Sequence, residues 1–432
     1  MRDLLLLTHR IPYPPDKGDK VRSFHLLKQL TRRFRVHLGT FVDSESDWKY
    51  VDDVRRMCGE TCFVRLDPLQ RRFASLQGLL RGEALTLSYY RHNKLTAWVK
   101  QLRGAYPIRH VLAFSSAMAQ YVIPDPATRS VADLVDVDSD KWRQYASTQP
   151  WPLSLLYRRE AEHLLAYERR VARSFDATVF VNSREAELFA CLAPESKPSI
   201  GFVNNGVDAD YFSPLRQYPN PYRQGVTAIA FTGAMDYWPN VDAAQWFAQQ
   251  IFPQLRRRFA NCEFHVVGAR PAKQVRRLER LPGVTVTGTV PDIRPYLAHA
   301  LLVVAPLRIA RGTQNKILEA MAMARPVLAS VQAAAGIDAR SDEEIIVAAG
   351  ADEFIVQATR LLEQQVTAGL GNKARERVLR DYDWATNLTG IEALLDSEAH
   401  PAAHNIAIDA VRAVASDRVQ GRSGAVQHGP AG

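Results

Sequence analysis

Short apolar runs alternate with helical patterns along most of the chain, and this alternation occurs twice. Residues 3–9, 35–42 and 110–116 are almost continuously apolar, as is typical of parallel strands covered on both faces. Prolines and glycine gather in residues 213–225, a composition typical of a linker, and the alternation then restarts at residue 227. Alternating strand and helix patterns favour parallel sheets with crossover helices. The sequence therefore predicts an α/β protein with two doubly wound, Rossmann-like domains facing across a cleft.

The length supports this division, because 432 residues exceed the ~100–200 residues of one typical domain. We expect an N-terminal domain over residues 1–208 and a second domain over 209–382. A closing helix over 383–398 is expected near the domain junction. Residues 399–432 are rich in alanine and glycine and contain no aromatic residue, which predicts a disordered tail.

Composition and charge restrict the partners. The four cysteines lack zinc-ligand spacing, so we expect reduced thiols and a cytoplasmic protein. The formal net charge of +9 favours anionic partners, yet no nucleic-acid-binding motif is present. No apolar run approaches the ~20 residues of a membrane span. Residues 70–82 are basic and amphipathic, so peripheral contact with an anionic membrane face is one hypothesis and a packed helix is the other.

Residues 308–330 place three cations at the start of a predicted helix. Lys316 lies in or near the first helical turn, where the helix dipole already supplies positive potential. Arg308 and Arg311 lie just before it and add to the repulsion. A bound anion explains such a cluster most easily, because helix N-termini and basic side chains both suit phosphate oxygens.

The neighbouring residues fit the same interpretation. Thr313 or Asn315 can cap the helix, and Gly312 allows a close backbone approach. Glu319 lies one turn beyond Lys316, on the same helix face, where a carboxylate can accept hydrogen bonds from a ribose. These features together predict a site for a nucleoside diphosphate. The alternative is an exposed Lys316–Glu319 pair among solvated arginines.

Several motifs resemble those of one enzyme family. The run NKILEAMAMARPVLAS (315–330) resembles the K-x-x-E-A-M-A-x-G-x-P-V donor-site motif of retaining glycosyltransferases of family 4 and their relatives, which have the GT-B fold. VNNGVDADYFSP (203–214) resembles the family's hinge segment. RIPYPPDKGDKVRSFHLL (10–27) and VDVDSDKW (135–142) add a similarity to bacterial sugar transferases of PEP-CTERM/exosortase systems and exopolysaccharide synthesis. The resemblance extends over residues 1–395.

The resemblance implies an activity and a set of site residues. It implies a retaining glycosyltransferase that moves a sugar from a nucleotide diphosphate sugar to a polysaccharide or lipid-linked glycan. No metal or cofactor is expected, since no ligand set has metal spacing. We expect the protein in the cytoplasm, at the inner face of the bacterial plasma membrane. The predicted donor-binding residues are Gly18, Gly233, Arg308, Arg311, Gly312, Thr313, Asn315, Lys316 and Glu319. The predicted catalytic residues are Asp136, Asp138, Arg311 and Lys316.

The chain departs from the family pattern in the donor domain. Arg311 stands eight residues before Glu319, where the family has a first glutamate. The arginine and lysine that the family carries after the glycine of its first donor-domain strand are also absent after Gly233. We expect Arg308 and Arg311 to replace that phosphate clamp. The alternatives are an epimerase of the same fold, which needs no acceptor, and a non-catalytic scaffold subunit.

Two loops of the first half have open roles. Gly18 begins a helix after the first strand, where Lys17, Lys20 and Arg22 could assist the donor; the alternative is an ordinary loop capped by Asp19.

The stretch with Asp136 and Asp138 has three interpretations. It is a D-x-D metal motif, an acidic pair that faces the cleft, or a pair of structural aspartates at the end of a strand. His9 is expected to be a core or surface histidine.

Overall fold

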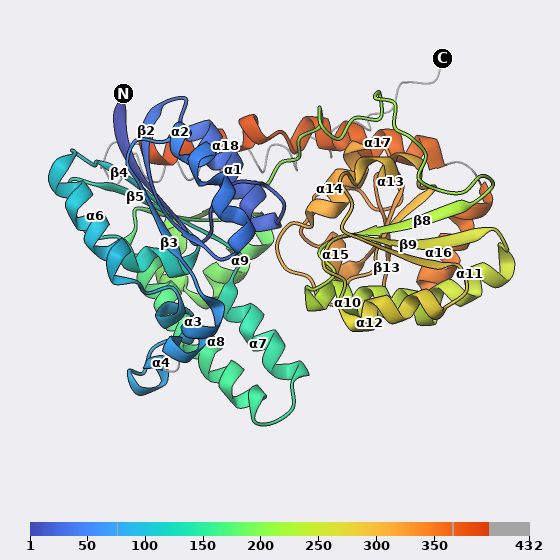
Figure 1. Cartoon of the computed structure of the whole chain (residues 1–432), viewed down its shortest axis with the longest axis horizontal. Helices are drawn as coiled ribbons and strands as arrows, with labels where there is room; N and C mark the ends of the chain where they lie inside the picture. The colour runs from blue at the N-terminus through green and yellow to red at the C-terminus, as the bar shows by residue number, and fades with distance from the viewer. Residues whose placement is uncertain (76, 365–366, 397–432) are drawn as a thin grey trace, which may run out of the picture. The chain divides into compact units, whose positions relative to one another are not determined.

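The computed structural model describes residues 1–75, 77–364 and 367–396, and the expected tail lies outside them. The chain divides into two compact units. Unit 1 comprises Met1–Asn204 together with Ala385–Gly432, described as far as Asp396. Unit 2 comprises Asn205–Trp384. Figure 1 shows one sheet in each unit.

Each unit is built on a parallel sheet. Unit 1 contains β1 (Arg2–Thr8), β2 (Phe34–Val42), β3 (Thr61–Arg65), β4 (His110–Phe114), β5 (Arg129–Val135), β6 (Ala177–Phe180) and β7 (Ile200–Phe202). Unit 2 contains β8 (Thr227–Thr232), β9 (Cys262–Val267), β10 (Val284–Gly288), β11 (Leu302–Ala305), β12 (Val327–Ser330) and β13 (Ile346–Ala348). The strand orders are β3-β2-β1-β4-β5-β6-β7 and β10-β9-β8-β11-β12-β13. In both sheets the order reverses at the first strand of the unit, which makes each sheet doubly wound.

Helices connect the strands. In unit 1 they are α1 (Gly18–Leu30), η1 (Glu45–Tyr50), α2 (Val51–Met57), α3 (Pro68–Ser75), α4 (Gln77–Leu80), α5 (Leu85–Tyr89), α6 (Asn93–Ala105), η2 (Ser116–Tyr121), α7 (Asp138–Thr148), α8 (Leu153–Ser174), α9 (Ser183–Leu192) and η3 (Pro194–Ser199). In unit 2 they are α10 (Trp238–Trp246), the π-helical turn η4 (Phe247–Ile251), α11 (Phe252–Arg258), α12 (Lys273–Arg276), η5 (Arg277–Arg280), α13 (Arg294–His299), α14 (Asn315–Ala322), α15 (Val331–Ala334), α16 (Ala351–Gln364) and α17 (Thr367–Asp381). The last helix, α18 (Trp384–Asp396), packs on unit 1: its Asp396 accepts a hydrogen bond from Arg2, and Arg129 donates to its Leu394 carbonyl.

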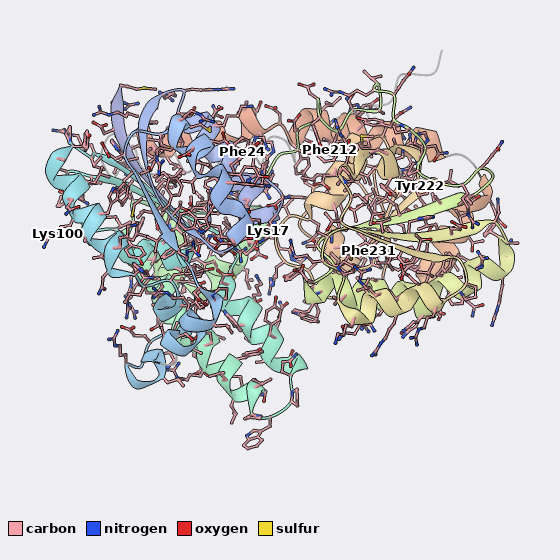
Figure 2. All side chains as sticks on the ribbon, viewed as in Figure 1. Lys17, Phe24, Lys100, Phe212, Tyr222 and Phe231 are labelled. Atoms are coloured by element: carbon pink, nitrogen blue, oxygen red, sulfur yellow. The ribbon has the colours of Figure 1, made fainter. Side chains whose placement is uncertain are left out.

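The predicted strands are confirmed, and the reason is burial on both faces. The run 3–9 lies largely in β1, where every residue from Asp3 to Thr8 is buried. The runs 35–42 and 110–116 likewise contain most of β2 and all of β4. Side chains fill both faces of each sheet (Figure 2).

The composition of the proline-rich stretch 213–225 predicted a linker between the units, but the stretch does not connect them. It lies inside unit 2, and its Tyr222 belongs to the hydrophobic core there (Figure 2). The Tyr222 hydroxyl donates to the Tyr296 carbonyl at 2.7 Å. Composition did not predict this packing, because burial of the Tyr222 ring fixes the stretch to unit 2 despite its several turn-forming residues.

Unit 1 contains two buried ion pairs in the helix after β1. Arg22 Nε donates to Asp133 Oδ2 at 2.8 Å, and Arg22 Nη1 donates to the Val203 carbonyl at 2.9 Å. Lys20 Nζ donates to Asp47 Oδ2 at 2.7 Å. Both cations are fully buried. The hypothesis that Lys20 and Arg22 assist donor binding is therefore wrong, because their charges are engaged inside the unit.

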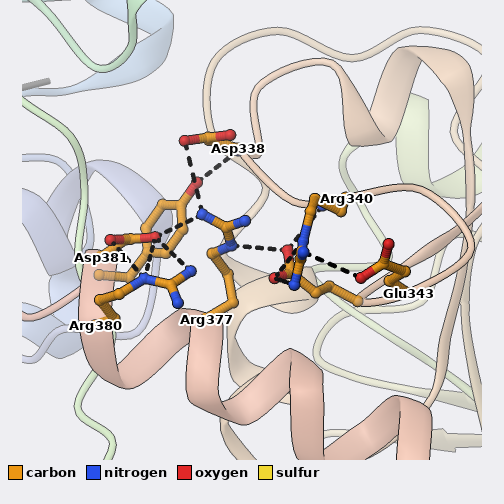
Figure 3. A network of polar contacts seen from close by, with 8 residues as sticks. Asp338, Arg340, Glu343, Arg377, Arg380 and Asp381 are labelled. Atoms are coloured by element: carbon orange, nitrogen blue, oxygen red, sulfur yellow. Dashed lines mark hydrogen bonds and ion pairs between the residues drawn. The ribbon is translucent and has the colours of Figure 1, made fainter. Parts of the chain in front are cut away.

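Unit 2 has a comparable network around Arg377 of α17 (Figure 3). The fully buried Arg377 donates to Glu344 and Asp381, each at 2.7 Å. Arg340 donates its backbone N–H to the same Glu344 carboxylate at 2.7 Å. The network fixes the long segment between α15 and β13 against α17.

We expect Arg22→Met to destabilise unit 1 by about 3–5 kcal/mol, because it leaves the Asp133 carboxylate buried without its partner. Burial already raises the pKa of Asp133, against the opposing charge of Arg22. Denaturant unfolding of both proteins measures the difference. Arg55→Met is the matched control, since Arg55 forms an exposed pair with Asp52 and its loss is expected to cost less than about 1 kcal/mol. Equal stability of the two variants would contradict a structural role for Arg22.

Candidate functional site

The order reversal in the unit 2 sheet lies between β8 and β11. Ligands of doubly wound sheets bind outside the carboxyl ends of the strands at such a reversal. Gly233 directly follows β8, and Arg308 lies three residues after the end of β11. The loop from Arg308 then leads into α14, so the predicted donor residues of this unit gather at the reversal.

Backbone packing at this point requires glycine. Gly233 and Gly268 follow neighbouring strands and have φ of 155° and 153°. A Cβ on Gly268 would lie 1.7 Å from the Gly233 carbonyl oxygen, and one on Gly233 would lie 2.9 Å from Asn240 Nδ2 and 3.3 Å from Lys316 Nζ. The β8 loop and Lys316 are therefore close neighbours, as the placement of both in one site requires.

Lys316 is held from two sides. Its Nζ donates to Asn240 Oδ1 at 2.5 Å and lies 4.9 Å from the centroid of the Phe231 ring. Asn240 is buried near the start of α10, and its Nδ2 donates to the Ala234 carbonyl at 2.9 Å. The amide thus fixes the ammonium against the loop after β8. The alternative of a solvent-exposed Lys316–Glu319 pair is wrong, because both side chains are half-buried.

Burial disfavours the charges of this pair. Desolvation lowers the pKa of Lys316 to about 8, with the Glu319 charge opposing the shift. Desolvation also raises the pKa of Glu319 to about 7, with the Lys316 charge opposing it. The charge of Glu319, one helical turn away, therefore offsets only part of the desolvation of the Lys316 ammonium. An anion in contact with Lys316 would restore its full charge.

The start of α14 is not capped as expected. Gln314 is the N-cap residue and its side chain makes no capping hydrogen bond. Thr313 Oγ1 instead donates to the Gly336 carbonyl at 3.3 Å, and Asn315 Oδ1 accepts from Asn205 Nδ2 at 3.4 Å. The prediction that Thr313 or Asn315 caps this helix is therefore wrong. Backbone N–H groups at a helix start without a side-chain cap can be satisfied by a ligand.

Arg308 and Arg311 lie in the loop before α14, and they do not form the expected cluster of repelling charges. Arg308 forms an ion pair with Asp242 of α10, with Nε donating to Oδ2 at 2.9 Å. Its charge is compensated, so the repulsion argument for Arg308 is wrong. Arg311 is half-buried, and its carbonyl accepts from Gln314 Nε2 at 2.8 Å. Gly312 has φ of 61°, a turn conformation that glycine adopts without strain.

The reversal in unit 1, between β1 and β4, carries a polar cluster that the sequence did not reveal. His9 follows β1 and contacts Asp19 Oδ2 through Nε2 at 3.0 Å. Arg10 donates to Asp19 at 2.7 Å and to Asp43 at 2.7 Å. The His9 ring stacks on Phe114, the last residue of β4. Burial opposes ionisation of Asp19, but hydrogen bonds and charge from His9 and Arg10 hold its pKa below the ordinary value. Its contacts show that Asp19 does not cap α1.

Backbone strain lies beside this cluster. Ser115 after β4 has φ of 81°, and Val135 at the end of β5 has φ of 69°. Positive φ is rare for a β-branched residue, and such strain often lies at functional sites. No spacing rule in the sequence predicts the pairing of His9 with Asp19; the only available signal was the position of His9 after the first strand.

Asp136 and Asp138 lie in the connection from β5 to α7. Asp138 is the first residue of α7 and lies 3.9 Å from Lys141. Two carboxylates already occupy the start of this helix: Glu185 accepts from the Val137 N–H at 2.9 Å, and Glu168 accepts from the Ser139 hydroxyl at 2.5 Å. Burial, followed by the charge of Asp138, raises the pKa of Glu168 to about 8. Gly18 lies at the same edge of the sheet, as the first residue of α1.

Comparisons with known proteins agree with this architecture. Glycosyl transferases group 1 is the family that matches residues 227–364. The match lies within unit 2 and covers β8 to α16. Sucrose-phosphate synthase from Thermosynechococcus elongatus has a similar structure, with a TM-score of 0.67 and 16% identity over 91% of this chain and 98% of that one. The whole described chain has the GT-B fold.

Two further solved structures are similar to this chain. Anabaena HepE in complex with UDP and glucose has a TM-score of 0.62 and 16% identity over 92% of this chain and 100% of that one. WaaG, a glycosyltransferase involved in lipopolysaccharide biosynthesis, has a TM-score of 0.61 and 16% identity over 91% of this chain and 100% of that one. A comparison with curated protein sequences finds no match.

Neither a metal site nor a membrane span is found among the described residues of this GT-B chain. Within residues 1–75, 77–364 and 367–396, no three His, Cys, Asp or Glu side chains group in a way that could hold a metal ion. None of the helices in these ranges has the length and apolar character needed to cross a bilayer.

We expect Lys316→Met to stabilise the ligand-free protein below pH 8 by on the order of 1 kcal/mol, because it removes a desolvated cation at the loss of one hydrogen bond. The gain should shrink as pH rises from about 8, the folded pKa, to about 10.4, the ordinary value of lysine. In that window the unfolded chain binds more protons, so wild-type stability rises relative to the variant. Urea unfolding at several pH values measures the difference, and a gain that grows with pH would contradict the account.

Proposed function

We propose that the chain is a glycosyltransferase that moves a sugar from a nucleotide diphosphate sugar to a hydroxyl of a polysaccharide or lipid-linked glycan. The observation that carries this proposal is the half-buried Lys316 at the sheet reversal, held by Asn240 beside the start of α14. The group 1 glycosyl transferase match over residues 227–364 supports it. HepE, whose structure resembles this chain, is described in complex with UDP-glucose.

The donor diphosphate would bind at the start of α14. Lys316 and the backbone N–H groups of Gly312, Thr313 and Asn315 would bind its oxygens, because cationic and N–H donors gather there. Gly233 permits close approach from the β8 side, since a Cβ there would crowd Lys316. Arg311 would add charge from the same loop. Arg308 would have a smaller role, because Asp242 already engages it.

The carboxylate of Glu319 would accept hydrogen bonds from the ribose. Its raised pKa has the same origin as the lowered pKa of Lys316, namely burial without a full partner. Two hydroxyl donors would stabilise the ionised carboxylate, just as phosphate would stabilise the ammonium. The two shifts therefore fit a single ligand whose anionic and hydroxylated groups lie a helical turn apart.

Catalysis would depend on stabilising the leaving diphosphate. Negative charge develops on the phosphate oxygens as the bond between the donor sugar and its diphosphate breaks. Fixed cations and N–H groups lower the energy of that state. We propose that the reaction proceeds without a metal ion or cofactor and, as the motifs imply, with retention of configuration. We further propose that Gly18 of unit 1 contributes to donor binding and that Asp136 and Asp138 act in catalysis. The His9–Asp19 pair would add a second polar group at the reversal of the same sheet.

We place this activity in exopolysaccharide or cell-envelope synthesis at the inner face of the bacterial plasma membrane. The motifs around residues 10–27 and 135–142 support this role. A lipid-linked or membrane-associated acceptor would require unit 1 to approach a bilayer surface.

We expect Lys316→Ala to weaken UDP binding at least tenfold, about 1.4 kcal/mol, because it removes one charge-assisted phosphate contact. Isothermal titration calorimetry of both proteins measures the effect. Lys273→Ala is the matched control, because Lys273 is an exposed lysine of the same unit, and it should bind as wild type does. Tight UDP binding by Lys316→Ala would refute the assignment.

Pyrophosphate separates the two halves of the site. Glu319→Gln should weaken UDP binding while leaving pyrophosphate binding unchanged, because only UDP carries a ribose. A parallel loss for both ligands would show that Glu319 acts through Lys316 rather than through the nucleoside.

We expect release of nucleoside diphosphate from the correct nucleotide sugar to continue in the presence of a chelator, because Lys316 and the α14 start stabilise the leaving group. A coupled assay of nucleoside diphosphate release, with and without a glycan acceptor, measures it. Loss of turnover on chelation and its recovery with manganese would favour a D-x-D role for Asp136 and Asp138. Sugar epimerisation without an acceptor would favour the epimerase instead.

A further inference from the structure

The helices α7 and α8 form a hairpin that extends from unit 1. α7 begins shortly after the carboxyl end of β5 and has 11 residues, whereas α8 has 22 and leads back to β6. At 1.5 Å per residue these lengths are about 16 and 33 Å. The two helices pack against each other. Because β5 and β6 are parallel, α8 must return past the sheet, and α7 therefore leads outward from its carboxyl edge. Figure 1 shows the hairpin extending beyond the strands of unit 1.

The turn of this hairpin exposes large apolar side chains. Trp151 is 76% exposed, Leu153 44% and Leu155 54%. They occupy the turn itself and the first turn of α8, whereas farther along α8 the apolar residues Leu164 and Val171 are buried. Three large apolar side chains within five residues are unusual for a surface in contact with water alone. Tryptophan with leucine is typical of segments that enter the headgroup region of a bilayer.

The charges around the turn have one sign. Residues 141–159 contain Lys141, Arg143, Arg158 and Arg159 and no carboxylate. Arg143 pairs with Asp140 at the edge of this segment, whereas Arg158 is exposed. Lys141 pairs with Asp138 near the start of α7, away from the turn. A negatively charged surface meeting the turn would therefore meet mainly Arg143 and Arg158.

A second basic segment is attached to the same hairpin. Residues 68–82, which include α3 and α4, contain three arginines and no carboxylate. Arg159 of α8 donates to the Gly78 and Glu83 carbonyls at 3.2 and 3.1 Å. Glu160 accepts from the N–H groups of Leu85 and Thr86. Figure 1 shows α4 near the hairpin.

We propose that unit 1 docks on an anionic lipid surface through the turn Trp151–Leu155, with the apolar side chains in the headgroup region and the flanking cations against lipid phosphates. The proposal rests on the proposed membrane location of the activity and deepens it by naming the surface. The carboxyl edge of the unit 1 sheet, with the His9–Asp19 pair, is the edge from which α7 leads to this turn. A lipid-linked acceptor would therefore reach the sheet reversal from the membrane side.

Charge complementarity selects lipid as the occupant. An apolar turn alone would equally suit a hydrophobic groove on another protein. The charged residues of segments 141–159 and 68–82 are all basic, which matches the continuous negative charge of a bilayer containing anionic lipid. Such attraction strengthens with each basic residue near the surface.

The test is flotation of the full chain with vesicles of neutral phosphatidylcholine and with vesicles containing anionic phosphatidylglycerol. Wild type should bind the anionic vesicles and release from them as salt rises. Trp151→Ser, Leu153→Ser and Leu155→Ser combined should reduce binding at least tenfold. The matched control combines Ile123→Ser, Val356→Ser and Leu379→Ser, whose side chains are 46%, 63% and 52% exposed elsewhere, and it should bind as wild type does.

Two additional variants test the charge. Arg158→Gln should weaken vesicle binding severalfold, whereas Arg257→Gln, at an exposed position of unit 2, should not. UDP binding without vesicles, measured on the same samples, should be equal in all these proteins. Loss of vesicle binding with normal UDP binding supports the docking surface, and absence of UDP binding in wild type would instead refute the proposed function.

Three outcomes would overturn the proposal. Vesicle binding by the triple turn variant at the wild-type level would exclude the apolar turn. Equal binding of wild type to neutral and anionic vesicles would exclude the charge component. Failure of wild type to bind either vesicle would exclude lipid and favour a protein partner as the occupant.

Discussion

The ammonium of Lys316 is the interaction on which the account of this molecule depends. Its position follows from the unit 2 sheet, whose strand order reverses between β8 and β11. The loop after β8 supplies Gly233, and the helix α10 that follows supplies Asn240, which holds the ammonium at 2.5 Å. Desolvation makes this cation unfavourable in the ligand-free protein. A half-buried charge with incomplete compensation is suited to an anion that arrives from outside.

The surrounding residues hold this arrangement in place. Thr313 donates to the Gly336 carbonyl, and the segment that follows Gly336 is fixed by the buried Arg377 network. Unit 1 uses buried charge in the same way, since Arg22 and Lys20 pair with Asp133 and Asp47. In unit 1 the carboxylate partners lie near the carboxyl ends of strands, since Asp133 is close to the end of β5 and Asp47 follows β2.

The fold could be predicted from the sequence because its signals are local. A fully buried parallel strand must be apolar along its whole length, as β1 is from Leu4 to Leu7. The start of α14, with Lys316 and Glu319, was predicted because all its residues lie within one short segment. β7, with three residues, is too short for such a signal.

Contacts between distant segments were not predictable. Asn240 holds Lys316 across 76 positions, and Arg22 pairs with Asp133 across 111; no periodicity or spacing in the sequence encodes either contact. Arg308 and Lys20 were assigned to a ligand because their partners Asp242 and Asp47 could not be located in advance. The pairing of His9 with Asp19 was missed for the same reason, although both residues flank one loop.

The most direct test of the central claim is a crystal structure of the protein with UDP bound. The account predicts that a β-phosphate oxygen lies within hydrogen-bond distance of Lys316 Nζ and of backbone N–H groups at the start of α14, with the ribose hydroxyls against Glu319. A UDP molecule bound elsewhere, with the contact between Lys316 and Asn240 intact and no phosphate nearby, would contradict it.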